Sequence, residues 1–407
     1  VTLEESTPAV KKKAAKHPIL NVIMYVVYGL LFTVGVALFS LAAWYRDTFD
    51  LEFKDLLYTL ASPLQGTGSE TFNEILAAIL PPTLIFVGLY ILSACMLDLL
   101  LRPRRPRLTT WLKRAGALLC AATLIFSVVY GIFAFRIPRY IQITSGETGF
   151  YEEHYIHPAD VVSTNGQTKN LIYIYLESME TTYADPELQD GNNYMPLLTQ
   201  LAAEHVSFTE HEDGSLGGFH TPLGTGWTIA ALTATASGIP YSFPVGHNGM
   251  SKERIFASGL TNLGDILEAA GYNQEFLCGS DVGFGGRDIY YEQHGDYRLF
   301  DLYTARDEGF IAADYYNAFW GYEDYILFDI AKSELTRMAA EDAPFNLTLL
   351  TVDAHHVGGY VCKVCGNDDT SPTANVISCS DRLVTEFVAW CMEQDFFEDT
   401  AIVITGD

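Results

Sequence analysis

Acidic residues follow three short apolar stretches of this sequence, at or just beyond the end of each stretch. Glu177 and Asp353 come directly after runs rich in Val, Ile, Leu and Tyr, and Asp407 comes one residue after a third such run. His355 and His356 follow Asp353. Hard divalent cations bind carboxylate oxygens, and imidazole widens the choice to manganese or zinc. The pattern indicates a metal site; the alternative is that the acids are ordinary loop residues or helix caps.

A glycine-rich stretch, residues 214–227, leads into a helical pattern that begins near Thr228. The free N–H groups and the dipole at a helix N-terminus favour a bound phosphate or an alkoxide. A metal ion beside the threonine would lower the pKa of its hydroxyl further. Thr228 is therefore a candidate nucleophile. The alternative is that Thr228 or Thr225 serves only as the N-cap of the helix.

Apolar runs alternate with helical patterns beyond residue 169, which is typical of a parallel sheet covered by helices on both faces. The predicted strands are 170–176, 273–277, 346–352 and 400–405. The predicted helices lie near 195–205, 227–237, 260–270, 322–340 and 374–393. Ligands bind beyond the carboxyl ends of such strands, so we expect the three acids to meet at one edge of the sheet.

The first third of the 407-residue chain differs in composition from the rest. Residues 1–139 hold 14 Lys plus Arg and 9 Asp plus Glu, whereas residues 140–407 hold 10 and 41, within a total charge of −26. A bilayer core of about 30 Å needs about 20 apolar residues in a helix. Three stretches qualify as membrane spans, with buried core helices as the alternative: 19–44, 75–101 and 115–135. The acidity of the whole chain argues against nucleic acid as a partner.

Basic residues are concentrated on one side of these spans, and Arg136 and Arg139, after the third span, are the weaker contrary signal. Lysines lie between residues 11 and 16, ahead of the first span, and basic residues crowd 102–114, between the second and third. Positively charged loops stay in the cytoplasm. We therefore expect a cytoplasmic segment at 1–18, a membrane region at 19–136, a linker with short extended pieces at 137–168, and an extracytoplasmic domain at 169–407.

Two further features have several interpretations. Cys362 and Cys365 form a Cys-x-x-Cys pair, and Cys379 follows them. Outside the cytoplasm these residues are candidates for a disulfide, with a structural zinc site or free thiols as the alternatives. The aromatic-rich stretch 315–325 is predicted to belong to the core, with a substrate groove as the alternative.

Four segments together carry a resemblance to a known family. They are NLIYIYLESMETTY at 170–183, GWTIAA at 226–231, SGIP at 237–240 and IVITGD at 402–407. In this order they resemble the phosphoglycerol transferase and lipoteichoic acid synthase family, within the sulfatase and alkaline-phosphatase-like superfamily. The resemblance covers 170–407 and implies an α/β fold, with a mainly parallel sheet flanked by helices. It also implies a further His ligand after Asp407, so we expect the catalytic domain to be incomplete in this chain.

The resemblance also implies roles for individual residues. Glu177, Thr228 and Asp407 would bind Mn²⁺ or Mg²⁺, and Thr228 would be the nucleophile. Arg287 would bind the phosphate, and His355 would contact the phosphoglycerol group. The implied reaction moves phosphoglycerol from phosphatidylglycerol, through a phospho-threonine-type intermediate, to an extracytoplasmic glycan or to a polyglycerolphosphate (teichoic-acid) acceptor. Three predicted spans, rather than the five usual in the synthases, favour the phosphoglycerol transferase branch.

Three alternative functions remain at this point. A phosphoethanolamine transferase also uses a threonine. A sulfatase or phosphodiesterase-type hydrolase belongs to the same superfamily, although the Cys-x-Pro-x-Arg-like signature of sulfatases does not occur in this sequence. The last alternative is a non-catalytic membrane scaffold that has kept the fold.

Overall fold

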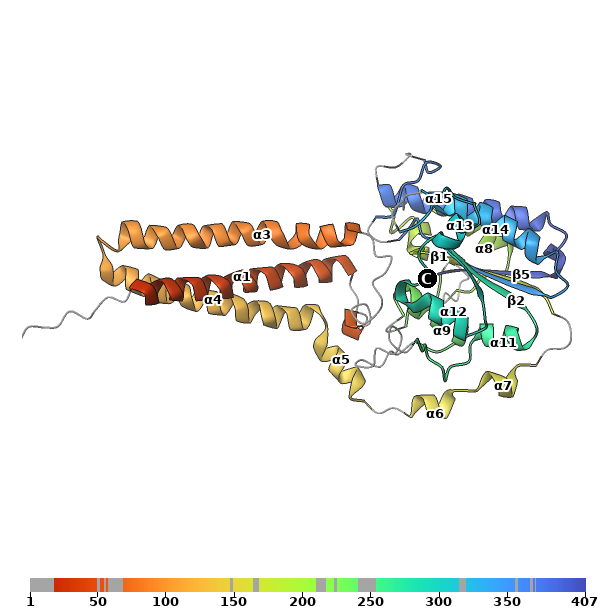
Figure 1. The fold of residues 1–407 in the computed structure, drawn as a ribbon, viewed down its shortest axis with the longest axis horizontal. Coiled ribbons are helices and arrows are strands. Elements are labelled where there is room, and N and C mark those ends of the chain that lie inside the picture. The colour runs from red at the N-terminus through yellow and green to blue at the C-terminus, as the bar shows by residue number, and fades with distance from the viewer. Residues whose placement is uncertain are drawn as a thin grey trace, which may run out of the picture. The chain divides into compact units, whose positions relative to one another are not determined.

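The computed structural model describes most of the chain. The described residues are 18–49, 52–54, 56–57, 69–146, 149–163, 168–209, 217–222, 225–240, 254–314, 320–355, 358–366, 369 and 371–407. The chain divides into two compact units, one of residues 1–50 with 72–139 and the other of residues 51–71 with 140–407 (Figure 1).

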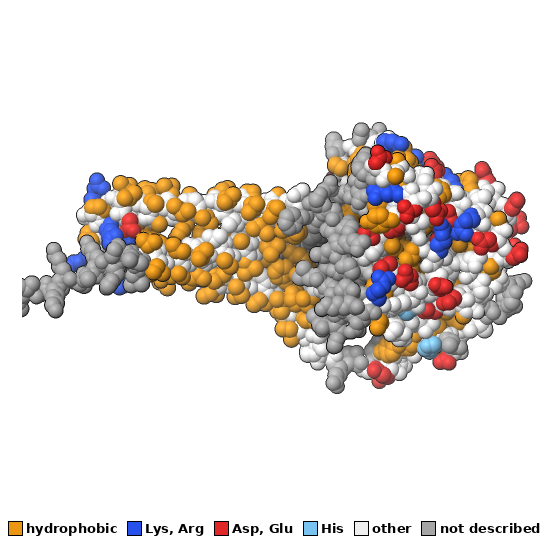
Figure 2. Space-filling model, in the orientation of Figure 1, with side chains coloured by type: hydrophobic (Ala, Val, Ile, Leu, Met, Phe, Trp, Pro, Cys, Tyr) orange, Lys and Arg blue, Asp and Glu red, His pale blue; other side chains and the backbone are white. Residues whose placement is uncertain are grey.

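The first unit contains long apolar helices. They are α1 (Pro18–Phe49), α3 (Ser69–Met96), which continues as a π-helical turn over Leu97–Leu101, and α4 (Pro106–Ala134). Within the described residues, three segments are long and apolar enough to cross a membrane: Val22–Thr48, Asn73–Leu101 and Pro106–Ala134. Hydrophobic side chains cover their visible face (Figure 2). The three predicted apolar helices are confirmed, and the third begins at 106 rather than at 115 because Pro106 starts the helix.

Buried small and aromatic residues hold α1 against α4. Ala42 is fully buried between them, and the rings of Tyr45 and Phe135 lie 4.9 Å apart. Asp98, near the end of the second span, forms an ion pair with Lys113 of α4, with 2.7 Å between Asp98 Oδ1 and Lys113 Nζ. This pairing keeps both charged groups at one end of the helices, next to the basic loop.

The second unit is built on a five-stranded parallel sheet of order β3-β2-β4-β1-β5. The strands are β1 (Asn170–Leu176), β2 (Asn273–Cys278), β3 (Arg298–Phe300), β4 (Phe345–Leu350) and β5 (Thr400–Gly406). The predicted parallel sheet is confirmed. β1 lies between β4 and β5, so Tyr175 is opposite both Leu350 and Thr405.

Helices cover both faces of the sheet (Figure 1). One layer contains α8 (Pro196–Glu204), α13 (Leu302–Asp307), α14 (Asp324–Met338) and α15 (Pro372–Met392). The other contains α9 (Thr228–Ser237), α11 (Leu263–Ala269) and α12 (Arg287–Gln293). Each layer packs its own hydrophobic cluster on the sheet, one centred on Leu347 and Leu349 and the other on Tyr175 and Phe276.

The structure differs from the sequence predictions in three places. The expected extended pieces of 137–168 are wrong, because this segment forms α5 (Ile137–Thr144), α6 (Phe150–His154) and α7 (Pro158–Val161). β3, α12 and α13 were not predicted, since three to seven residues are too few to show a period. β4 ends at Leu350 rather than at 352, because the N–H groups of Val352 and Asp353 bind the Asp324 carboxylate instead of a neighbouring strand.

Candidate active site

The ends of β1 and β5 place two acids side by side. Leu176 is opposite Gly406 in the ladder, so the next residues, Glu177 and Asp407, leave the sheet together. The Ser178 N–H donates to Asp407 Oδ1 at 2.8 Å, which fixes that carboxylate against the β1 turn. A Cβ atom at Gly406 would collide with the Met179 carbonyl, so glycine is required for this close approach.

Both oxygens of the Glu177 carboxylate accept hydrogen bonds. The Ser178 hydroxyl donates to Oε1 at 2.9 Å, and the Thr228 hydroxyl donates to Oε2 at 3.3 Å. The Glu177 N–H donates to Thr351 Oγ1 at 2.8 Å. Ser178 has a φ of 54°, a left-handed conformation that is costly for a residue other than glycine and is typical of functional sites.

Thr228 is the first residue of α9, and its side chain faces Glu177 instead of capping the helix. The N-cap is Trp227, in extended conformation and without a side-chain cap bond. Thr225 donates its hydroxyl to the Pro222 carbonyl at 2.8 Å. Neither threonine therefore caps α9, which removes the N-cap alternative. The first N–H groups of a helix point out of its N-terminus, where they can donate to a bound anion.

The two acids form a pair of like charge, in which Glu177 is buried and Asp407 is half-buried. Burial raises the pKa of Glu177, although hydrogen bonds with Asp407 and Ser178 oppose this shift. Burial raises the pKa of Asp407 well above its usual range, and the charge of Glu177 raises it further. Such a pair is unfavourable without a compensating cation. With the Thr228 hydroxyl it offers the all-oxygen donor set of a hard divalent ion, so the residues present fit Mn²⁺ or Mg²⁺.

Arg287 begins α12 and is held rigidly by its own loop. It is 5% exposed. Its Nη2 donates to Ser280 Oγ at 3.1 Å and to the Asp281 carbonyl at 2.6 Å, and its Nε donates to the Phe284 carbonyl at 3.0 Å. A guanidinium fixed in this way binds a phosphate without losing much side-chain entropy.

One cavity brings most of the predicted site residues together. Its lining residues are Glu177, Thr228, Ser280, Phe284, Arg287, Trp320, Leu350, Thr351, Val352 and His355. The ring of His355 packs on that of Trp320, with centroids 4.3 Å apart. Asp407 adjoins this cavity through Glu177.

Sequence reasoning did not identify Ser178, Thr351 or Trp320 as site residues. Trp320 belongs to the aromatic-rich stretch, for which a groove was the alternative to the core, and residues 315–319 lie outside the described residues. His356 also lies outside them.

Asp353 does not join the other two acids. Its Oδ2 accepts from the Asp324 N–H at 3.1 Å, while the Asp324 carboxylate accepts from the N–H groups of Val352 and Asp353 at 2.7 and 3.1 Å. Among the described residues, the three predicted acids do not converge on one point. The expectation of a three-acid metal site is therefore wrong for Asp353, because the N-terminus of α14 binds its carboxylate.

The Asp324–Asp353 pair predicts a pH-dependent stability. Burial raises the pKa of Asp324 to about 7 and, together with the charge of Asp324, that of Asp353 to about 10. The unfolded chain releases these protons at lower pH, so the free energy of unfolding should fall as pH rises from 4 toward 10. Asp353→Asn mimics the protonated acid. We expect this variant to match the parent within about 1 kcal/mol at pH 4 and to exceed it at pH 9.

Denaturant titration of the purified chain at pH 4 and pH 9 checks this expectation. Asp329→Asn is the matched control, because Asp329 lies on the same helix but its side chain is 72% exposed and pairs with Lys332. If the free energy of unfolding falls by the same amount between the two pH values in the parent and in Asp353→Asn, the pair does not titrate as proposed.

The three predicted cysteines form one cluster. The Sγ atoms of Cys362, Cys365 and Cys379 all lie within 4.8 Å of one another. No S–S bond joins them, since each of the seven cysteines is a free thiol. The predicted disulfide stays a prediction.

Known proteins match most of this sequence. The sulfatase family model matches residues 169–407. The chain is 30% identical over 365 residues to phosphoglycerol transferase I of Xanthomonas axonopodis pv. citri, covering 86% of this chain and 48% of that protein. It is 29% identical over 394 residues to phosphoglycerol transferase I of Escherichia coli O127:H6, covering 94% and 47%. The chain thus spans about half the length of the curated relatives it matches.

Two solved structures of enzymes show partial likeness to this chain. The lipoteichoic acid synthase LtaP of Listeria monocytogenes is 17% identical, with a TM-score of 0.46 over 58% of this chain and 55% of that one. The lipooligosaccharide phosphoethanolamine transferase A of Neisseria meningitidis is 15% identical, with a TM-score of 0.47 over 95% of this chain and 73% of that one.

Proposed function

The chain belongs to the sulfatase family, and from this membership we propose that it is a membrane-anchored phosphoglycerol transferase. The observation that carries the proposal is the Thr228 hydroxyl at the start of α9, 3.3 Å from the buried Glu177 carboxylate and in one cavity with Arg287. The name of the relatives, phosphoglycerol transferase I, supports the choice of the transferred group.

The proposed reaction has two displacements. Thr228 Oγ1 attacks the phosphorus of phosphatidylglycerol, the bond from phosphorus to the diacylglycerol oxygen breaks, and diacylglycerol leaves with the threonine proton. An acceptor hydroxyl then attacks the phosphothreonine, its proton returns to Thr228, and the phosphoglycerol is transferred. A manganese or magnesium ion held by Glu177, Asp407 and Thr228 would act as a Lewis acid and lower the pKa of the threonine hydroxyl.

The remaining residues of the cavity stabilise negative charge and orient the donor. Arg287 binds non-bridging phosphoryl oxygens, with its guanidinium fixed by Ser280 and the backbone. His355, supported by the ring of Trp320, contacts the phosphoglycerol group. The N–H groups at the start of α9 face the same oxygens.

The membrane helices fit a lipid donor. We infer a multi-pass cell-membrane protein with its N-terminus in the cytoplasm and the sheet domain outside, where it meets the phosphatidylglycerol headgroup. The acceptor is then an extracytoplasmic glycan or polyglycerolphosphate, and nucleic acid is not a partner.

Phosphatidylglycerol labelled in its headgroup tests this function. The full-length protein in detergent, with Mn²⁺ or Mg²⁺, is expected to release diacylglycerol and to carry the label transiently. Turnover of phosphatidylethanolamine instead would identify a phosphoethanolamine transferase, and release of free glycerol phosphate without an acceptor would identify a hydrolase. Inactivity on all these substrates would favour the scaffold.

The inferred orientation predicts which surfaces a membrane-impermeant maleimide reaches in intact cells. Glu268→Cys places a thiol on the exposed end of α11, and Arg104→Cys places one in the exposed basic loop between two spans. We expect labelling above the parent background for the first variant, and labelling of the second only after permeabilisation. The reverse result would place the sheet domain in the cytoplasm.

A further inference from the structure

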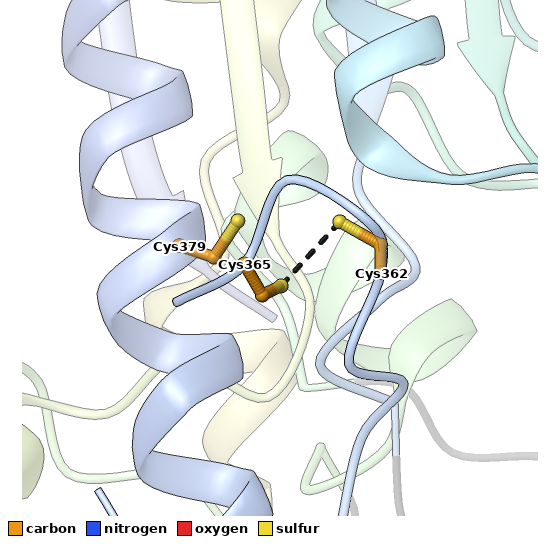
Figure 3. A group of neighbouring side chains, drawn as sticks. All are labelled: Cys362, Cys365 and Cys379. Carbon is orange, nitrogen blue, oxygen red and sulfur yellow. Dashed lines mark hydrogen bonds between the residues drawn. The ribbon is translucent and has the colours of Figure 1, made fainter. Parts of the chain in front are cut away.

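A group of three thiols lies apart from the residues of the proposed reaction. Cys362 and Cys365 lie in the segment that leads from β4 to α15, and Cys379 lies on α15 itself (Figure 3). Cys362 and Cys379 are 3% and 5% exposed. The Sγ atoms of Cys362 and Cys365 are 3.4 Å apart, and all three sulfurs are within 4.8 Å of one another.

These spacings match sulfurs that share a metal ion. Tetrahedral zinc with Zn–S bonds of about 2.3 Å places its sulfur ligands roughly 3.8 Å apart. The Cys362–Cys365 separation is 3.4 Å and no separation in the cluster exceeds 4.8 Å, so the sulfurs are as close as a shared zinc ion requires. A disulfide joins two sulfurs at about 2.05 Å and leaves the third unused. The three thiols converge on one point, whereas a disulfide would need only two of them.

A guanidinium group lies beside the cluster. Arg382 Nη2 donates to Cys379 Sγ at 3.6 Å and to the Val364 carbonyl at 2.9 Å. Zinc with three thiolates carries one net negative charge, and the Arg382 guanidinium is placed to balance it.

We propose that Cys362, Cys365 and Cys379 bind Zn²⁺ as a structural site that fastens the segment after β4 to α15. This segment begins with the turn that carries His355, so the zinc would hold the cavity wall in place. The soft thiolate donors distinguish this site from the oxygen donors of Glu177 and Asp407, which suit a hard cation.

Zinc content and cobalt spectra of the purified full-length protein test the site. We expect one more equivalent of zinc in the parent than in Cys379→Ser, and a thiolate-to-cobalt charge-transfer absorption in the Co²⁺-loaded parent that this variant lacks. Cys391→Ser is the matched control, because Cys391 is a fully buried thiol of the same helix outside the cluster. It is expected to keep both signals.

Peptide mapping tests the same proposal without any variant. Alkylation of the denatured, chelated parent without reductant is expected to modify all three cysteines. Recovery of two of them as a disulfide, with no bound zinc, would overturn the proposal. Equal zinc contents in the parent and in Cys379→Ser would overturn it as well. Neither result depends on transferase activity, so failure here is distinguishable from failure of the proposed function.

Discussion

Replacement of Thr228 by alanine is expected to lower the release of diacylglycerol from phosphatidylglycerol by about 10⁴-fold or more, because loss of a nucleophile removes the covalent route entirely. The Thr228 hydroxyl lies at the start of α9 and donates to the buried Glu177 carboxylate at 3.3 Å. The measurement is diacylglycerol release with Mn²⁺ or Mg²⁺, together with label on the protein from headgroup-labelled lipid. Both signals should disappear.

Thr228→Ser is the matched variant, since it keeps the hydroxyl and loses only a methyl group. We expect it to retain a measurable share of the activity and to form a labelled serine. If Thr228→Ala keeps more than about a tenth of the parent rate, the nucleophile is another group or water. Thr228 would then serve only to bind the metal or phosphate.

Much of the sheet and part of the site follow from local sequence. β1 and β5 are runs of apolar residues long enough to be recognised as buried parallel strands, and they end within one residue of the predicted positions. Because parallel strands end at one edge, Glu177 and Asp407 were expected together, and the ladder between β1 and β5 places them so.

Contacts between distant parts of the chain determine which of the other side chains reach the candidate site. Asp353 follows its strand just as Glu177 does, but the N-terminus of α14 offers it a backbone donor and turns it away from the other acids. Trp320 reaches the cavity from outside any predicted strand end and packs on His355. No spacing in the sequence indicates either contact.

The cysteines illustrate the same limit. From the sequence, three interpretations of Cys362, Cys365 and Cys379 were possible: a disulfide, a zinc site or free thiols. Spacing along the chain does not tell how far apart the sulfur atoms lie. Cys379 is brought to the pair by the packing of α15 against the sheet, with Arg382, one turn further along, bonded to both segments. Three sulfurs around one point are a property of the fold.

Asp407→Asn is expected to separate metal binding from folding. The amide keeps an oxygen for the Ser178 N–H, which donates to Asp407 Oδ1 at 2.8 Å, but it removes one of two neighbouring carboxyl groups. Burial and the charge of Glu177 raise the pKa of Asp407 well above its usual range, so the acid is unfavourable in the metal-free protein. The metal-free variant should therefore unfold at a temperature at least as high as the parent.

Metal should then stabilise the parent and leave the variant nearly unchanged, because stabilisation by a ligand follows its affinity for the folded state. We expect Mn²⁺ affinity and diacylglycerol release to fall more than about 100-fold in Asp407→Asn and in Glu177→Gln. Thermal unfolding across a Mn²⁺ titration measures the first quantity independently of turnover. Glu180→Gln is the control, since Glu180 is exposed and its carboxylate accepts a hydrogen bond from the Thr182 hydroxyl. If Mn²⁺ raises the unfolding temperature of the parent and of Asp407→Asn equally, the two carboxylates do not hold the ion. Their proximity would then serve only to position the ends of β1 and β5.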